Sequence, residues 1–371
     1  MRKRKGLMQE KRGTNGDVSV PSFQHMKMRI FTVLLVIGAF GCGSVHAQEQ
    51  TPPLIRGALW WVTDAYKDWT REQFDQAMQA QCDVGFDVLW ILNTPGLLDR
   101  ALEAEAAGES KDVLGIVYDV ADAKGMRVIA DLPKGGWYGK AEAVDMVATV
   151  TDYIRRYHGR YGHHKSFYGW YLNYEINPID PGDTIESAFW RSAWKAITVE
   201  CHRVTPDSVV TISPFFLLDD TSRRGFIYLT PEQYASWWGK TLEETGIDIL
   251  MLQDSGEHLS FFTLEQREPF FAAMAKACHD TGAQFWVNVE TGEAHVADWD
   301  EFIALSQERK VPWRFTPIDW LEKKLRLAAR YGDSIINWGY FPYMDPFPPG
   351  EPHPGAKEAY DAYKAYYGRV K

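Results

Sequence analysis

The feature that most constrains the fold of this chain is a unit that recurs along it: a helical segment, then a glycine, then a short apolar run. A glycine at this position ends a helix in the left-handed conformation, and a short apolar run is typical of a buried strand. The unit occurs at Gly85, Gly125, Gly246, Gly282 and Gly332. With three further apolar runs, the predicted strands are 54–61, 86–93, 126–132, 167–173, 208–213, 247–253, 283–289 and 334–338.

Helix starts are marked as clearly as helix ends. Thr70 and Thr263 are each followed three residues later by glutamine, which predicts a capping box. Thr230 and Thr316 each precede a proline, which predicts a threonine cap before proline at the first helical position. Helices and strands therefore alternate from about residue 54 to the end of the chain.

Eight apolar strands that alternate with helices indicate a parallel sheet buried on both faces. Closed on itself, that sheet is a (β/α)8 TIM barrel, which we predict as a single domain over residues 51–371. An open, doubly wound sheet is the alternative. It is less favoured because no glycine-rich phosphate turn follows the first strand, which continues as Trp60, Trp61, Val62, Thr63 and Asp64.

The first 47 residues read as processing signals rather than as part of the fold. An apolar run at 30–41 follows Lys27 and Arg29 and precedes a small-x-small site that ends at Ala47. We predict a signal peptide at 26–47, preceded by an upstream extension at 1–25, and hence export to the periplasm or the extracellular space. Cleavage after Ala47 is favoured over lipoprotein processing at Cys42. The apolar run is too short for stable membrane insertion.

Removal of that segment changes the charge of the chain. It takes eight of 40 basic and two of 50 acidic residues, which leaves 32 and 48 and a net charge of −16. Such a charge argues against nucleic acid as a partner and is compatible with a neutral substrate. Three cysteines remain, at Cys82, Cys201 and Cys278, without metal-ligand spacing. We therefore predict no metal and no cofactor.

Two strands end in the same way, and a TIM barrel places its chemistry at these carboxyl ends. The run 167–173 leads through Asn173 and Tyr174 into Glu175, and the run 283–289 leads through Asn288 into Glu290. Two such strands in one barrel would direct two carboxylates into one pocket. Each glutamate alone could equally be a solvated charge at the rim, but the repeated pattern favours a site.

Amides and aromatic rings occur at the other strand ends, and this mixture is typical of a carbohydrate site, where they bind hydroxyls and apolar ring faces. For the stretch 253–258 the alternatives are a hydrogen-bonded turn and, less favoured, a hard-cation site formed by Asp254, Glu257 and Glu290. Trp170 is also a candidate for the cleft unless strand alternation turns it outward. The predicted substrate-binding residues are Trp61, Asn93, Trp137, Asn173, Tyr174, Gln253, Asp254, Glu257, His258, Asn288, Glu293, Trp338 and Tyr340.

The two glutamates at the ends of the fourth and seventh strands resemble the arrangement in a large clan of TIM-barrel glycoside hydrolases. In that clan the two positions supply the acid/base and the nucleophile, although its asparagine directly precedes the acid/base, whereas Asn173 lies two residues before Glu175. A finer resemblance is to the bacterial family called domain of unknown function 4434, carried by the segments 167–175, 234–238, 251–258 and 286–290. It implies an exported, glycosidase-like barrel.

We therefore predict an exported glycoside hydrolase of the retaining type, with Glu175 as acid/base and Glu290 as nucleophile. The aromatic residues around Glu175 are expected to desolvate it and keep it protonated, whereas Glu290 is expected to stay ionised. Glu257 and Glu293 are reserve candidates. The alternative is an inactive carbohydrate-binding barrel, which a salt bridge to either glutamate would favour.

Overall fold

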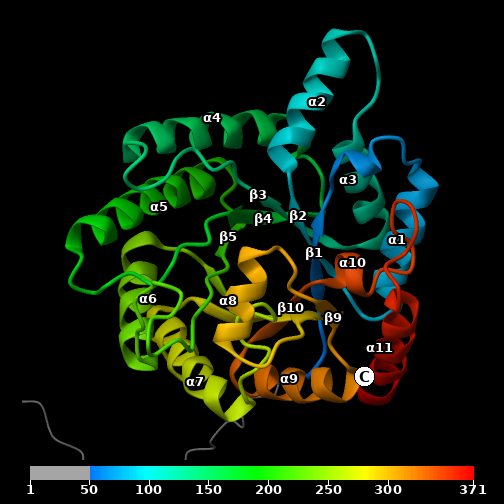
Figure 1. Ribbon diagram of the computed structural model, residues 1–371. Coiled ribbons are helices and arrows are strands. Elements are labelled where there is room, and N and C mark those ends of the chain that lie inside the picture. The colour runs from blue at the N-terminus through cyan, green and yellow to red at the C-terminus, as the bar shows by residue number, and fades with distance from the viewer. Residues whose placement is uncertain (1–50) are drawn as a thin grey trace, which may run out of the picture. The chain divides into compact units, whose positions relative to one another are not determined.

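The computed structural model describes residues 51–371, and these form a closed barrel of parallel strands surrounded by helices (Figure 1). The predictions for 1–25, for 26–47 and for Cys42 concern residues outside this described part. The barrel strands are β1 (Gly57–Trp61), β2 (Val88–Leu92), β3 (Arg127–Asp131), β4 (Phe167–Leu172), β5 (Val209–Ile212), β6 (Ile249–Asp254), β7 (Gln284–Glu290) and β10 (Ser334–Trp338).

Each barrel strand pairs in parallel with its neighbours, in the order β1, β10, β7, β6, β5, β4, β3, β2 and back to β1. The predicted (β/α)8 TIM barrel is therefore confirmed. Two further strands, β8 (Gly292–Ala294) and β9 (Trp313–Phe315), pair antiparallel in a small separate sheet. In the sequence, both follow β7 and precede β10. The sequence had not indicated this addition at the carboxyl end of the barrel.

The helices follow the strands around the outside of the barrel (Figure 1). They are α1 (Arg71–Asp83), α2 (Thr94–Ala106), α3 (Val113–Lys124), α4 (Ala143–Tyr161), α5 (Thr184–Val204), α6 (Pro231–Thr245), α7 (Leu264–Thr281), α8 (Trp299–Gln307), α9 (Ile318–Tyr331), α10 (Tyr340–Tyr343) and α11 (Ala356–Val370), with a short 3₁₀ helix η1 (Asp64–Tyr66). Within residues 51–371 no helix is long and apolar enough to cross a membrane.

The local signals for helix starts and helix ends are confirmed with two exceptions. Capping boxes form at Thr70, Thr230 and Thr263, and the glycines at 85, 125, 246 and 282 have positive φ. Gly332 is instead extended, with φ −87°. Thr316 is not a cap, because α9 begins one residue later than predicted, after Pro317.

Strand alternation divides the core into two layers. Side chains such as Trp90, Tyr171 and Trp286 point into the barrel and pack together there. Their neighbours point outward under the helices; Trp170 is one of these, and its indole nitrogen donates to Thr205 Oγ1 at 2.9 Å. Trp170 is therefore a core residue, and its candidacy for the cleft is wrong.

Candidate active site

Glu175 and Glu290 lie at the carboxyl ends of β4 and β7 and line a common pocket. Glu290 is the last residue of β7, and Glu175 follows the end of β4 by three residues. Gln253, on β6 between them, donates from Nε2 to Glu175 Oε1 at 3.1 Å and to the carbonyl oxygen of Ser213 at 2.8 Å. The amide thus holds the Glu175 carboxylate over the barrel mouth.

Glu290 is 6 % exposed and is held by the loop that follows β6. The backbone N–H of Gly256 donates to its Oε2 at 2.6 Å. Burial raises the pKa of Glu290 to about 8; the Gly256 bond and Lys324 oppose this shift, and the charges of Glu175 and Glu257 add to it. Near neutral pH, Glu290 of the free protein therefore holds a proton.

The burial of the two carboxylates is the reverse of the sequence-based expectation. Glu175 is exposed, so the predicted desolvation by aromatic residues is absent. The reason is that Trp170 and Tyr174 turn away from the carboxylate into the layer beneath α4 and α5, and Tyr171 into the barrel. The expectation that Glu290 stays ionised is likewise wrong for the free protein, because the loop after β6 covers it.

Glu175 lies where two pockets meet. The larger pocket has a volume of about 580 Å³ and the smaller about 160 Å³, and Glu175 and Trp338 line both. Glu290 lines only the smaller one. The larger pocket is also lined by Leu59, Trp61, Leu92, Asn93, Pro95, Asp131, Pro133, Lys134, Tyr171 and Asn173, and the smaller by Trp90, Phe215, Gln253, Ser255, Glu257, His258, Asn288 and Trp313.

Eight of the thirteen predicted substrate-binding residues line these pockets. Trp61 is 62 % exposed at the rim of the larger pocket, where a sugar ring could stack on it. In the smaller pocket Glu257 lies 3.3 Å from His258, whose hydrogen bond lowers the pKa of the Glu257 carboxyl. The residues that the structure places in the two pockets are Trp61, Asn93, Asn173, Gln253, Glu257, His258, Asn288 and Trp338.

Three predicted aromatic residues lie outside the pockets. Tyr174 is buried with its ring against Trp190 and its hydroxyl accepting from the N–H of Gly135 at 3.1 Å. Trp137 packs on the same cluster, 5.2 Å from Trp190. Tyr340 is fully buried beside Phe86. The prediction was wrong for these side chains because each of them packs into the apolar layer outside the barrel rather than over the barrel mouth.

Two carboxylates that were predicted to bind substrate form buried ion pairs instead. Asp254 is buried between Arg267, at 2.6 Å, and Lys324, at 3.2 Å. Burial acts to raise the pKa of Asp254, but these two cations outweigh it and lower the pKa. Glu293 is 1 % exposed and pairs with Arg314 at 2.8 Å.

Neither carboxylate can therefore bind substrate, and Glu293 is no longer a reserve nucleophile. For the alternative of a cation site at 253–258, Asp254 is already paired with Arg267 and Lys324. Within residues 51–371 there is no group of three or more His, Cys, Asp or Glu that could hold a metal ion.

Asp131, at the end of β3, lines the larger pocket although it was not among the predicted substrate-binding residues. It is 3 % exposed and accepts hydrogen bonds from the N–H groups of Asn93 and Thr94, from Thr94 Oγ1 and from Asn173 Nδ2, at 2.6–3.2 Å. Burial raises its pKa to about 6 against these four bonds. Its position at a strand end in a run of apolar residues was the available signal. Through its hydrogen bond with Asn173 Nδ2, Asp131 positions Asn173 on the pocket wall.

Trp313 was also missed, since it lies on β9, outside the predicted units. It forms a wall of the smaller pocket, with its ring 6.3 Å from that of Trp338.

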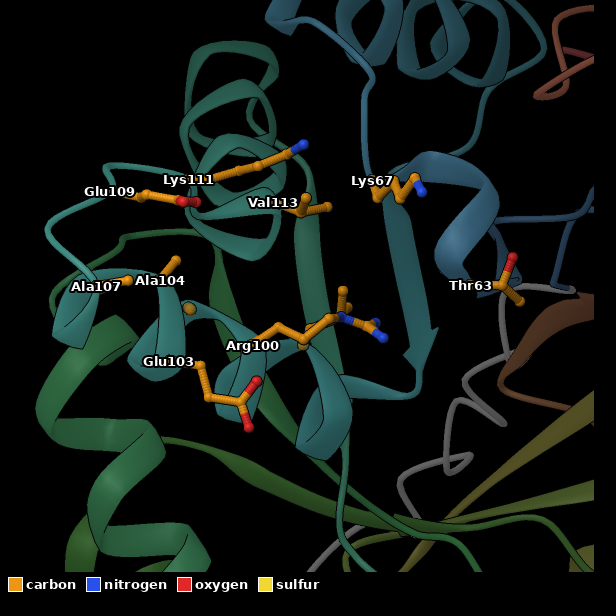
Figure 2. Close-up of a pocket in the computed structure, with 11 residues that line it drawn as sticks. Thr63, Lys67, Arg100, Glu103, Ala104, Ala107, Glu109, Lys111 and Val113 are labelled. Carbon is orange, nitrogen blue, oxygen red and sulfur yellow. The ribbon is translucent and has the colours of Figure 1, made fainter.

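Another pocket, of about 380 Å³, shares no lining residue with these two (Figure 2). It runs along α2, and Figure 2 shows Arg100, Lys67 and Lys111 around it. Arg100 pairs with Asp64, and Lys111 pairs with Asp68 at 2.7 Å, both at exposed positions. Two of its cations are thus already neutralised.

Comparison with known proteins supports the architecture. Residues 48–351 match the family described as "Domain of unknown function (DUF4434)". A search of curated proteins found no match. A crystal structure of a protein provisionally assigned as an alpha-L-fucosidase, from Bacteroides thetaiotaomicron, superposes with a TM-score of 0.65 at 19% identity, covering 91% of this chain and 100% of that one.

Two other similar structures are the catalytic domain of the major endoglucanase from Xanthomonas campestris and a beta-galactosidase from Marinomonas. The first has a TM-score of 0.50 at 11% identity, over 85% of this chain and 95% of that one. The second has a TM-score of 0.52 at 11% identity, over 85% of this chain and 59% of that one. At these identities the likeness shows a shared fold alone, the TIM barrel.

Proposed function

The chain belongs to the DUF4434 family, and from this premise and the geometry of its site we propose that it is a glycoside hydrolase that cleaves an O-glycosidic bond with Glu175 and Glu290. The observation that carries the proposal is the placement of these two carboxylates, from β4 and β7, at one pocket among amides and tryptophans. Glycosidic cleavage needs one carboxylic acid and one carboxylate on opposite sides of the bond. The names of the structurally similar glycosidases support the same class.

Position within the site suggests a role for each carboxylate. Glu175 lines both pockets and so lies where the bond between a sugar and its leaving group would cross from one to the other. We assign it as the acid/base, which gives its proton to the departing oxygen and later takes a proton from water. Glu290, inside the smaller pocket, would attack the anomeric carbon and form a covalent intermediate that this water hydrolyses with overall retention.

For these two roles, Glu175 must carry a proton and Glu290 must be ionised. In the free protein that proton lies on Glu290. The reactive form carries it on Glu175 and leaves Glu290 ionised, so the proton must pass from Glu290 to Glu175 before the bond is cleaved. We expect kcat/KM to fall as the pH rises above about 8, because Glu290 then loses the proton that this transfer requires. A constant kcat/KM between pH 7 and about 10 would contradict this account.

Substitution of each glutamate tests the assignment. On aryl glycosides with a good leaving group, Glu290→Gln should abolish the first step, with a loss of about 10³-fold or more in kcat/KM. Glu175→Gln should retain that step, slow the breakdown of the intermediate and show a burst of released phenol. Nuclear magnetic resonance of the first sugar product should show the anomer of the substrate. Near-normal rates in both variants would sink the assignment, and the opposite anomer would replace retention by inversion.

The alternative of an inactive carbohydrate-binding barrel would be favoured by a salt bridge to either glutamate. Among residues 51–371 no salt bridge involves Glu175 or Glu290, and Lys324 donates to the carbonyl oxygen of Glu290 rather than to its carboxyl group. The lack of a salt bridge to either glutamate within residues 51–371 supports an enzyme over an inactive binding barrel.

A further inference from the structure

The two pockets at the carboxylates differ in size and in what surrounds them. The larger, of about 580 Å³, includes the exposed rim residue Trp61 together with Lys134. The smaller, of about 160 Å³, contains Glu290 and is walled by side chains from β2, β6, β7, β9 and β10 and from the loops after β4, β5 and β6. A bond between the carboxylates therefore has a confined space on one side and a wide one on the other.

The far wall of the smaller pocket is backed by packed aromatic side chains. Phe215 and His258 line it, with their rings 5.4 Å apart. Behind them, Trp299 and Phe302 of α8 each lie with the ring centre 6.2 Å from that of His258. Arg224 covers the same rings and approaches Glu257 at 4.0 Å. This side of the smaller pocket is therefore bounded by packed aromatic rings.

Three side chains that line the confined pocket carry buried polar atoms without a partner within residues 51–371. Trp90 Nε1 and Asn288 Oδ1 make no hydrogen bond within residues 51–371, and both residues are 1 % exposed. His258 Nδ1 is unpartnered there as well. A buried donor or acceptor without a partner costs free energy, so these three atoms indicate that a polar ligand binds here. Sugar hydroxyls can both donate and accept, as such a set requires.

We propose, on the basis of the function proposed above, that the enzyme is exo-acting: the confined pocket takes one terminal sugar residue, and the rest of the substrate lies in the larger pocket on Trp61. Trp90 and Asn288 bind hydroxyls of the terminal sugar. Each catalytic event therefore releases a single monosaccharide.

The product pattern tests this directly. A fluorescently labelled oligosaccharide that the enzyme hydrolyses should shorten one residue at a time, with a monosaccharide as the sole small product at every time point. The same oligosaccharide with its terminal residue blocked by a bulky ether should resist hydrolysis. Early release of di- or trisaccharides, or cleavage of the blocked substrate, would overturn the exo-acting proposal while leaving the glycosidase intact. Failure to hydrolyse any glycoside would instead defeat the proposed function.

The recognition residues have a matched control. Trp90→Phe removes the free indole donor and keeps an aromatic ring, and Asn288→Ala removes the free acceptor. Each should lower kcat/KM about tenfold and weaken the binding of free monosaccharides, measured by saturation-transfer nuclear magnetic resonance. Trp194 also has a buried, unpartnered indole nitrogen within the described residues, but it packs in the outer core against Trp238. Trp194→Phe should therefore leave monosaccharide binding unchanged; equal losses in all three variants would reduce the effect to packing and refute the assignment.

Discussion

At residue 290, burial and the neighbouring charges act on one carboxyl group and make the stability of the fold depend on pH. Its pKa rises from 4.5 to about 8 on folding, so the folded state binds a proton more tightly than the unfolded state does. The contribution of this group to stability is fully present below pH 4.5 and is lost as the pH rises to about 8. Asp131, with a pKa raised to about 6, acts in the same direction over a lower range.

Glu290→Gln should remove the larger of these two effects. The free energy of unfolding of the wild-type protein should fall between about pH 5 and about pH 8.5, and that of the variant should fall less, because glutamine does not titrate. The glutamine oxygen can still accept from Gly256, which keeps the loop in place. Urea titrations at several pH values provide the measurement. Identical pH dependence in both proteins would show that the Glu290 carboxyl is not protonated by burial.

At the scale of one element, the loop that follows β6 depends on a close approach that only glycine allows. A Cβ at Gly256 would lie 1.9 Å from the carbonyl oxygen of Gly292 on β8, and this oxygen belongs to the backbone. The loop would therefore have to move away from β8. The N–H that binds Glu290 would move with it.

Gly256→Ala is expected to lower both stability and activity. The free energy of unfolding should fall by about 1–3 kcal/mol, and kcat/KM should fall because Glu290 loses its hydrogen-bond donor. Gly159, inside α4, is the matched control because a Cβ added there would meet no atom within 4 Å. Gly159→Ala should be neutral or stabilising by up to about 1 kcal/mol. Thermal unfolding and kinetics of both variants decide the matter, and a fully active Gly256→Ala protein would speak against the role of the loop.

At the scale of the whole described barrel, the last helix holds the first strand. Tyr363 of α11 accepts from the N–H of Ile55 at 2.8 Å, and Tyr366 donates to the carbonyl oxygen of Pro53 at 2.7 Å. These bonds join residues 308 and 313 positions apart, just before β1 pairs with β2 and β10. The closure of the barrel is therefore supported from outside by α11.

Tyr363→Phe tests this connection because it leaves the ring and removes the acceptor. The buried N–H of Ile55 would lose its partner, at a cost of about 1–3 kcal/mol in the free energy of unfolding. Tyr367, on the same helix, is only half-buried, so Tyr367→Phe should change stability by less than about 0.5 kcal/mol. Chemical denaturation measures both. Equal stabilities of the two variants would mean that the Tyr363 bond contributes nothing.

Much of this molecule could be predicted from local patterns in the sequence. Glycines at helix ends, threonine caps and short apolar runs are determined by neighbouring residues, so the eight strands and the barrel could be predicted. The same patterns placed Glu175 and Glu290 at strand ends that converge on one pocket. Among the helix caps, Gly332 and Thr316 differed, at the two ends of α9. The small sheet of β8 and β9 was not predicted.

The tertiary structure alone decided which side chains face the site and which of them carry charge. Asp254 and Glu293 occur at strand ends like Glu290, yet Arg267 and Arg314, supplied by other elements, convert them into structural ion pairs. The raised pKa of Glu290 follows from its burial, to which the loop after β6, a different strand, contributes. Burial and long-range charge depend on contacts between residues far apart in the chain, whereas caps and periodicity act over a few residues. The sequence by itself therefore determined the barrel and its carboxylate pair, and the tertiary structure decided their chemistry.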